Sequence, residues 1–230
     1  LIRHGKYKSA GEMYIRNSSS KENMEQNEAM ISSMWESWST EIAQSREITV
    51  EELNAMLNDL ELNFPSDFLE KGLVDELFTR AELKQQLCDL YSAESFEDIK
   101  AIQFPDYVKA KSTSTVKADK KVAVIYAEGN IVDGNEKQQV AGDRFAGIIE
   151  DVRKDSTVKA VVLRVNSPGG SVLASEKIKN EIELLQKRGV PVIASYGDYA
   201  ASGGYWISAG CYKIFSNATT LTGSIGVFSM

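Results

Sequence analysis

Residues 190–206 read VPVIASYGDYAASGGYW, an apolar run that leads into a patch of very small side chains. The run at 190–194 predicts a short buried strand, and the residues around Ser202 predict a helix that begins just behind it. Backbone so free of side chains lets a substrate carbonyl approach both the Ser202 hydroxyl and the amides of the first helical turn. A helix start selected only for close packing has the same composition, so the role of Ser202 depends on the rest of the chain.

Strands and helices alternate on both sides of this stretch. Strands are expected at 122–126, 160–165, 190–194 and 212–215, and helices at about 141–154 and from 171 to Gly189. This order is typical of βαβ units on a mostly parallel sheet, so we predict an α/β fold. The run at 160–165 is apolar throughout, which predicts burial on both faces. Functional groups gather at the carboxyl ends of parallel strands, where Ser202 and the turn Ser167–Gly170 both fall.

The first half of the chain shows the sequence patterns of helices instead. Capping-box patterns at Ser19/Glu22 and Thr49/Glu52 predict helices from about residue 20 and from 50 to about 60, and a third short helix is expected at 81–87. The first helix carries an apolar stripe that we interpret as core or subunit interface, comprising Ile31, Met34, Trp35, Trp38 and Ile42. Residues 109–120 are polar and small, so we divide the chain into 1–108, a linker at 109–120, and 121–230.

Composition excludes several classes of function. The 230 residues carry a net charge of −7 and no long basic run, which argues against a nucleic-acid partner. A single histidine, His4, and two unrelated cysteines, Cys88 and Cys211, match no metal site, so neither a metal nor another cofactor is expected. No run of eighteen apolar residues occurs. Both ends read like strands, so we expect the chain to be an internal piece of a longer protein.

Three loops are candidates for one catalytic site. They are Ser167–Gly170, Ser202 with Gly203, and Thr222–Ser224. A base for the serine is the missing group, because His4 lies at the edge of the chain and no Gly-x-Ser-x-Gly elbow is present. A lysine that burial keeps neutral remains as the base.

Three motifs carry a resemblance to a known family, and they are LRVNSPGGS at 163–171, AASGGYWIS at 200–208 and LTGSIG at 221–226. With these, residues 122–230 resemble the signal peptide peptidase A family, also called protease IV. The loop GKYKSA at 5–10 is similar to the lysine loop of that family, and GLVD at 72–75 to the end of a repeat. Because the lysine loop precedes the serine, the chain resembles the long, two-repeat form of Gram-negative bacteria. The resemblance implies a ClpP/crotonase-like fold, with a helical segment between two incomplete repeats.

The resemblance also implies roles for single residues. Ser202 matches the nucleophile and Lys8 the general base of a Ser-Lys dyad, with Lys6 as a rival in the same loop. Ser224 matches the serine that orients the lysine.

The amides of Gly169 and Gly203 match the oxyanion hole, with Gly170 as a near alternative. The implied enzyme is a serine endopeptidase that cleaves residual signal peptides or other apolar segments. It would be a homo-oligomer of the bacterial inner membrane, anchored through a segment outside this chain, with its catalytic domain in the periplasm. Two other interpretations remain open: an inactive peptide-binding scaffold of the same fold, and a crotonase-type acyl-CoA enzyme.

Overall fold

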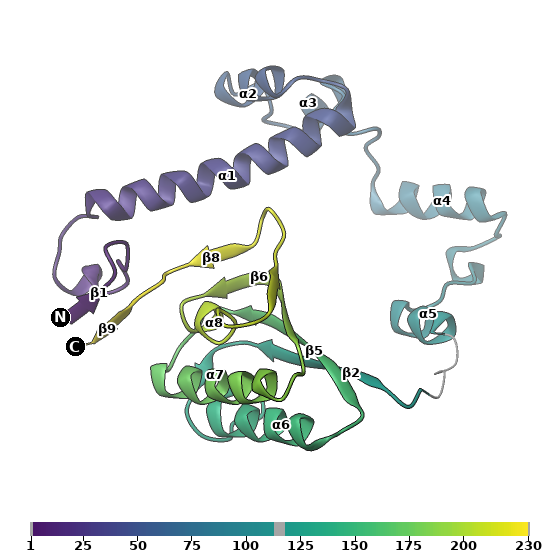
Figure 1. Ribbon diagram of the computed structural model, residues 1–230. Coiled ribbons are helices and arrows are strands. Elements are labelled where there is room, and N and C mark those ends of the chain that lie inside the picture. Colours follow the sequence, from purple (N-terminus) through teal and green to yellow (C-terminus); the bar gives the residue numbers. More distant parts are fainter. Residues whose placement is uncertain (1, 113–117, 230) are drawn as a thin grey trace. The chain divides into compact units, whose positions relative to one another are not determined.

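The computed structural model describes residues 2–112 and 118–229, which form two compact units. Of the described residues, the first unit comprises 2–37 and 118–229, and the second comprises 38–112. Figure 1 shows that the first unit contains the whole β-sheet, whereas the second consists of helices and connecting segments.

The sheet of the first unit is parallel throughout. Its strands are β2 (Lys121–Glu128), β5 (Val158–Ser167), β6 (Val192–Ala201) and β7 (Lys213–Phe215), in that spatial order, and β8 (Leu221–Gly223) pairs with the second half of β6. Helices α6 (Gly142–Lys154) and α7 (Val172–Lys187) pack together beside it (Figure 1). The predicted α/β class with a mostly parallel sheet is therefore confirmed.

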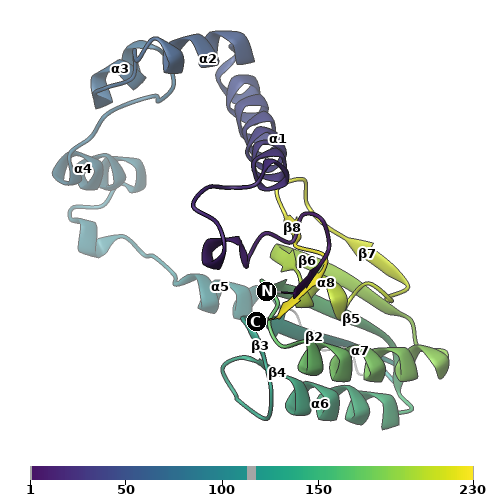
Figure 2. The same ribbon diagram turned by 90° about the vertical axis from the view of Figure 1, so that its left-hand side faces the viewer.

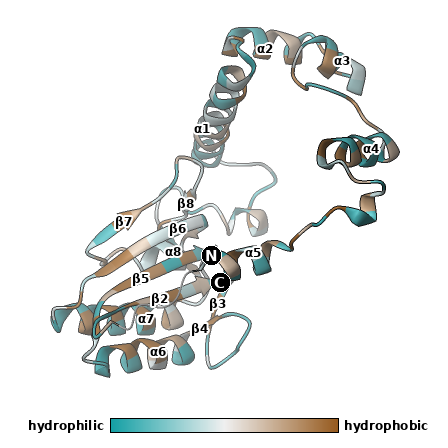
Figure 3. Cartoon of the chain, turned by 90° about the vertical axis from the view of Figure 1, so that its right-hand side faces the viewer, coloured by the Kyte–Doolittle hydropathy of each residue, from teal (hydrophilic) through white to brown (hydrophobic). Residues whose placement is uncertain are grey.

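The core lies between the sheet and these two helices. Its fully buried side chains alternate along β5, where Val161, Leu163 and Val165 are 0–1% exposed. Ile149 of α6 and Ile178 of α7 pack against the same face. The expectation that this strand is buried on both faces is wrong: the residues between are only half-buried, and on the neighbouring strand β2 Tyr126 is 67% exposed. In Figure 3, both β2 and β5 carry the colour of hydrophobic residues.

Strand β6 is twice as long as its apolar run predicts. It continues through Asp198 to Ala201 because its second half gains a parallel partner, with Tyr199 opposite Leu221 and Ala201 opposite Gly223. Residues 195–201 gave no strand signal, and it is the pairing with β8, with Ser167 of β5 opposite Ala200 on the other side, that makes the extended conformation favourable. Ser202 therefore follows directly on the last residue of a strand.

Two short pairs complete the first unit. The parallel pair β3 (Ile131–Val132) and β4 (Val140–Ala141) forms a bridge from Ile131 to Gly170. The antiparallel pair β1 (Ile2–His4) and β9 (Val227–Ser229) joins the two ends of the chain, as Figures 1 and 2 both show. Helix α8 (Gly203–Trp206) and the 3₁₀ turn η1 (Glu12–Tyr14) are the remaining elements of the site region.

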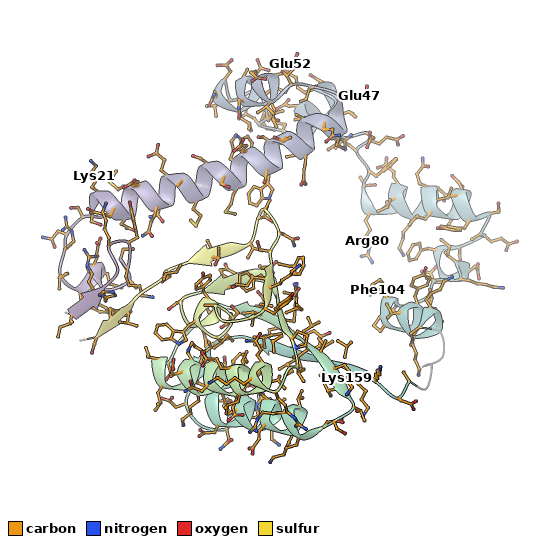
Figure 4. The ribbon with its side chains drawn as sticks, in the orientation of Figure 1. Lys21, Glu47, Glu52, Arg80, Phe104 and Lys159 are labelled. Atoms are coloured by element: carbon orange, nitrogen blue, oxygen red, sulfur yellow. The ribbon has the colours of Figure 1, made fainter. Side chains whose placement is uncertain are left out.

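Helix α1 (Lys21–Arg46) begins where it is expected, but with a different cap (Lys21 is labelled in Figure 4). The Ser20 hydroxyl accepts the Asn23 N–H, and Glu12, from outside the helix, accepts the N–H of Ser20. The capping serine is therefore Ser20 and not the predicted Ser19, and the carboxylate is that of Glu12 and not of Glu22.

The apolar stripe of α1 is not core. Ile31 is 61% exposed, Trp38 is 48% exposed and Ile42 is 40% exposed, and the buried positions of the helix are Ser39 and Ala43. The interface interpretation of the stripe stays a prediction.

Besides the end of α1, the second unit contains four helices among its described residues. They are α2 (Val50–Asn58), α3 (Pro65–Glu70), α4 (Arg80–Tyr91) and α5 (Phe104–Lys111), with the 3₁₀ turn η2 (Phe96–Asp98) before α5. The capping box of Thr49 and Glu52 is confirmed (Figure 4 labels Glu52 on α2), and α4 is longer than predicted. Helix α5 overlaps the start of the predicted linker at 109–120, whose residues 113–117 lie outside the described part of the chain. The division into two repeats stays a prediction.

Candidate active site

Ser202 occupies the junction between β6 and α8 in a conformation that is rare for a residue with a side chain. Its φ of 51° and ψ of −116° place it at the N-cap of α8. The backbone is held there from both sides, because the Ser202 N–H donates to the Gly223 carbonyl and its carbonyl accepts the Trp206 N–H. Such strain is tolerated where the surroundings fix it, and it is common at active sites.

The two glycines after Ser202 are required by close packing. A Cβ on Gly203 would lie 2.6 Å from Ser175 Oγ, and one on Gly204 would lie 2.5 Å from the Ser167 carbonyl oxygen. Helix α8 can therefore approach α7 and the end of β5 only without side chains at these positions.

Lys8 reaches Ser202 from the other end of the sequence. It lies in the loop between β1 and η1 and is only 5% exposed. Its Nζ lies 2.9 Å from Ser202 Oγ, 2.8 Å from Ser224 Oγ and 2.9 Å from the Ser224 carbonyl oxygen. The structure thus brings together three residues that the sequence singled out, and two oxygens of Ser224 fix the amine against the serine hydroxyl.

The pairing of β1 with β9 positions the lysine loop. At the end of β1, a Cβ on Gly226 would lie 2.2 Å from the His4 carbonyl oxygen, and one on Gly5 would lie 2.8 Å from that of Ile225. Both glycines have positive φ values, 145° and 111°. These glycines let the loop cross the segment after Ser224 at van der Waals contact, which carries Lys8 into the site.

The environment of Lys8 favours its neutral form. Burial lowers the pKa of the Lys8 ammonium, and its three hydrogen-bond acceptors are uncharged oxygens. The rival Lys6 is exposed, with its ammonium 5.0 Å from the centre of the Tyr7 ring. His4 is exposed as well and forms part of β1.

The amides near Ser202 differ in whether their N–H groups are already hydrogen-bonded. The Gly169 N–H donates to Ser167 Oγ at 3.1 Å and is therefore occupied. In the bridge between Ile131 and Gly170, the Ile131 N–H donates to the Gly169 carbonyl and the Ser171 N–H donates to the Ile131 carbonyl. The N–H of Gly170 itself takes no part in this parallel bridge and points away from Ile131. Gly170 lines the same cleft as Ser202 and Gly203. The structure therefore favours the alternative Gly170, together with Gly203, as the oxyanion pair, and the assignment of these amides stays a prediction.

A cleft with a cavity volume of about 90 Å³ opens over these groups. Lys8, Ser202 and the two glycines form its polar part, and most of its other walls are apolar. The side chains of those walls come from α7, α8 and the segment around β9, and they are Val172, Tyr205, Trp206, Ile225, Val227 and Phe228. The Trp206 ring is held by a 2.8 Å hydrogen bond from its Nε1 to Glu176 Oε2.

The arrangement has the parts of an acyl-transfer site: a hydroxyl, an amine in contact with it, two amides and an apolar cleft. The model of peptidase family S49 matches residues 1–94 and 184–230. The chain belongs to peptidase family S49. It is 38% identical to Protease 4 of Haemophilus influenzae and 38% identical to that of Salmonella typhi, over its whole length in both comparisons. It is 31% identical to the chloroplastic serine protease SPPA of Arabidopsis thaliana over 98% of the chain.

The S49 chain spans 39%, 38% and 34% of the lengths of these three relatives. Among solved structures, a mutant of the 1510-N membrane-bound stomatin-specific protease covers 42% of the chain and 44% of its own length, at 27% identity and a TM-score of 0.33. A mutant of ClpP1 from Listeria monocytogenes covers 36% of the chain and 43% of its own, at 20% identity and a TM-score of 0.30.

Two structural features of this S49 site had no sequence signal. The cleft walls at Val227 and Phe228 lie in the last few residues, where nothing in the pattern indicates a ligand. Glu12, a buried carboxylate, lies in a 3₁₀ turn that the sequence did not predict.

Within the described residues, the structure contains no helix long and apolar enough to cross a membrane.

Proposed function

We propose that Ser202 and Lys8 are the catalytic dyad of a serine endopeptidase. The observation that carries this proposal is the 2.9 Å contact between Lys8 Nζ and Ser202 Oγ, made by a lysine that is 5% exposed. A solvated lysine with a pKa of about 10.4 is neutral in only about one molecule in 2,500 at pH 7. Burial reduces that obstacle, because it disfavours the charged form and lowers the pKa of Lys8.

The geometry supports a two-step acyl transfer. Neutral Lys8 takes the hydroxyl proton as Ser202 Oγ attacks the carbonyl carbon of the scissile peptide bond. The tetrahedral oxyanion accepts hydrogen bonds from the N–H groups of Gly203 and Gly170. The Lys8 ammonium then gives its proton to the leaving amine, and the C–N bond breaks. In the second step water attacks the acyl-enzyme, with Lys8 again as the base, and the serine is released.

Ser224 orients the base during both steps. Its hydroxyl and carbonyl oxygens hold Nζ at 2.8 and 2.9 Å, which leaves little freedom for the amine to turn away from Ser202. We assign Ser224 a positioning role, since it contacts the base and not the scissile bond.

The apolar cleft favours apolar peptide segments as substrates. Residual signal peptides, which the name of the family suggested from sequence, fit that chemistry. We further propose that the natural enzyme works at the bacterial inner membrane, facing the periplasm and anchored through a segment outside this chain, and that it assembles as a homo-oligomer. These points rest on the similarity to Protease 4.

Covalent labelling tests the dyad directly. A fluorophosphonate probe should modify Ser202 of the natural full-length protein, as located by mass spectrometry, and the Lys8→Ala variant should react at least 100-fold more slowly. Lys6→Ala is the matched control, because it removes a lysine from the same loop, and it should react like the wild type. Labelling that survives in Lys8→Ala, or that is lost in Lys6→Ala, would show that Lys8 is not the base. An unlabelled wild type would favour the inactive scaffold.

A further inference from the structure

A partly buried ion pair that the dyad chemistry does not use joins β1 and η1, the two elements that flank the lysine loop. We infer that Arg3 and Glu12 are positioning residues for Lys8: together they clamp its loop, and by neutralising each other they leave the amine without a net neighbouring charge. This inference rests on the proposed role of Lys8 as base.

Glu12 joins the two ends of the loop. Its carboxylate accepts from Arg3 Nη1 at 3.0 Å and from the Ser20 N–H at 3.0 Å, so that it connects β1 to the start of α1. Arg3 Nη1 also donates to the Lys8 carbonyl oxygen at 3.4 Å. The clamp therefore contacts the backbone of the lysine itself.

The two partners are buried to different degrees. The Glu12 side chain is 7% exposed, whereas that of Arg3 is 36% exposed. Hydrogen bonds from the side chain and backbone of Ser20, with a smaller contribution from Arg3, hold the pKa of Glu12 below its usual range. Glu12 therefore stays ionised without Arg3, and removing Arg3 exposes Lys8 to an uncompensated negative charge.

A second tether of the loop carries no charge. Ser9 Oγ donates to Asn23 Oδ1 at 2.9 Å and accepts from Gln26 Nε2 at 2.8 Å, both on α1. Loss of this tether would loosen the loop without changing the field at Lys8, so Ser9→Ala is a matched control.

Few other charges surround the amine. Residues 221–229, which include Ser224, contain no ionisable side chain. The exposed Tyr7 hydroxyl of the loop donates to Glu25, and Lys6 is exposed. The ionisable groups on the elements around Lys8 include Arg3 and His4 on β1, Glu12 on η1, Lys21, Glu22 and Glu25 on α1, Asp198 on β6, Glu176 on α7 and Tyr205 on α8. Of these, Arg3 is hydrogen-bonded to Lys8, and Glu12 is paired with Arg3.

The inference predicts opposite shifts from the two halves of the pair. A unit charge about 10 Å away, at an effective dielectric constant of about 20, moves a pKa by roughly one unit, and salt reduces this to about half. Arg3→Gln leaves a negative charge, which raises the pKa of Lys8 and moves the acid limb of kcat/KM to higher pH by about 0.5–1 unit. Glu12→Gln leaves a positive charge and moves the limb to lower pH by a similar amount.

The experiment is kcat/KM against pH on an apolar peptide, with the natural full-length protein. The Arg3→Gln/Glu12→Gln variant and Ser9→Ala should keep the wild-type limb at a reduced rate, and Arg3→Lys, which retains the charge, should also keep it. Shifts of the two single variants in the same direction, or no shift at all, would overturn the inference. The inference would also be overturned if the acid limb of Arg3→Lys were displaced as far as that of Arg3→Gln.

A second measurement covers variants too slow to assay. In a Ser202→Ala background, the reactivity of Lys8 towards acetic anhydride as a function of pH, followed by mass spectrometry, reports its pKa directly. The same opposite shifts are expected, and equal titration curves would overturn the inference. Failure of the proposed function looks different, because Lys8→Ala would then retain activity and the wild-type acid limb.

Discussion

Removing the Ser224 hydroxyl tests how the base is held. Ser224→Ala deletes the 2.8 Å contact to Lys8 Nζ but leaves the carbonyl contact at 2.9 Å. A hydrogen bond to a charged or partly charged group contributes about 1.5–3 kcal/mol. At about 1.36 kcal/mol for each factor of ten, kcat/KM should fall by roughly 10- to 100-fold. Lys8→Ala removes the base itself and should cost several orders of magnitude more.

The assay is steady-state cleavage of a short apolar peptide at a pH on the plateau. Thr222→Val is the matched control, because it removes a hydroxyl two residues away that donates to the Ala200 carbonyl at 2.8 Å within the sheet. It should keep kcat/KM within about twofold, since it leaves the contacts of Lys8 intact. If Ser224→Ala is as slow as Lys8→Ala, or no slower than Thr222→Val, the positioning role of Ser224 is refuted.

Two further predictions concern packing around the cleft. Gly203→Ala should lower the Tm by several degrees, because its Cβ would lie 2.6 Å from Ser175 Oγ, and adding Ser175→Ala should recover part of the loss in a thermal melt; no recovery would contradict this cause. Glu176→Ala should raise KM for apolar peptides a few-fold with little change in kcat, because it frees the Trp206 ring, whereas Glu183→Ala on the same helix should behave as wild type; equal effects of the two would argue against a role for Glu176.

The sequence predicted the alternation of strands and helices and the place of Ser202 behind a strand, because these depend on local pattern. The apolar runs and the glycines around Ser202 are all within a few residues of one another. It could not choose between Lys6 and Lys8 from spacing alone, since the choice depends on which side chain the crossing of Gly5 and Gly226 turns inward.

Features set by distant partners were missed or misassigned. Strand β6 extends to Ala201 because β8 pairs with it, and the Gly169 N–H is engaged by the side chain of Ser167. The stripe at Ile31 and Trp38 has the period of a core helix, yet no segment of the described chain buries it. Periodicity identifies a face but not what covers that face.

The pH dependence of covalent labelling at Ser202 tests the central claim most directly. Burial lowers the pKa of Lys8, so the rate of fluorophosphonate labelling should rise with pH through one ionisation that lies below the ordinary lysine range. Because the folded pKa is the lower one, the cost of the buried charge is fully present below it. Stability should therefore increase between the folded and unfolded pKa values. A labelling rate that is flat from about pH 6 to 10, or falls as pH rises, would contradict a neutral lysine base.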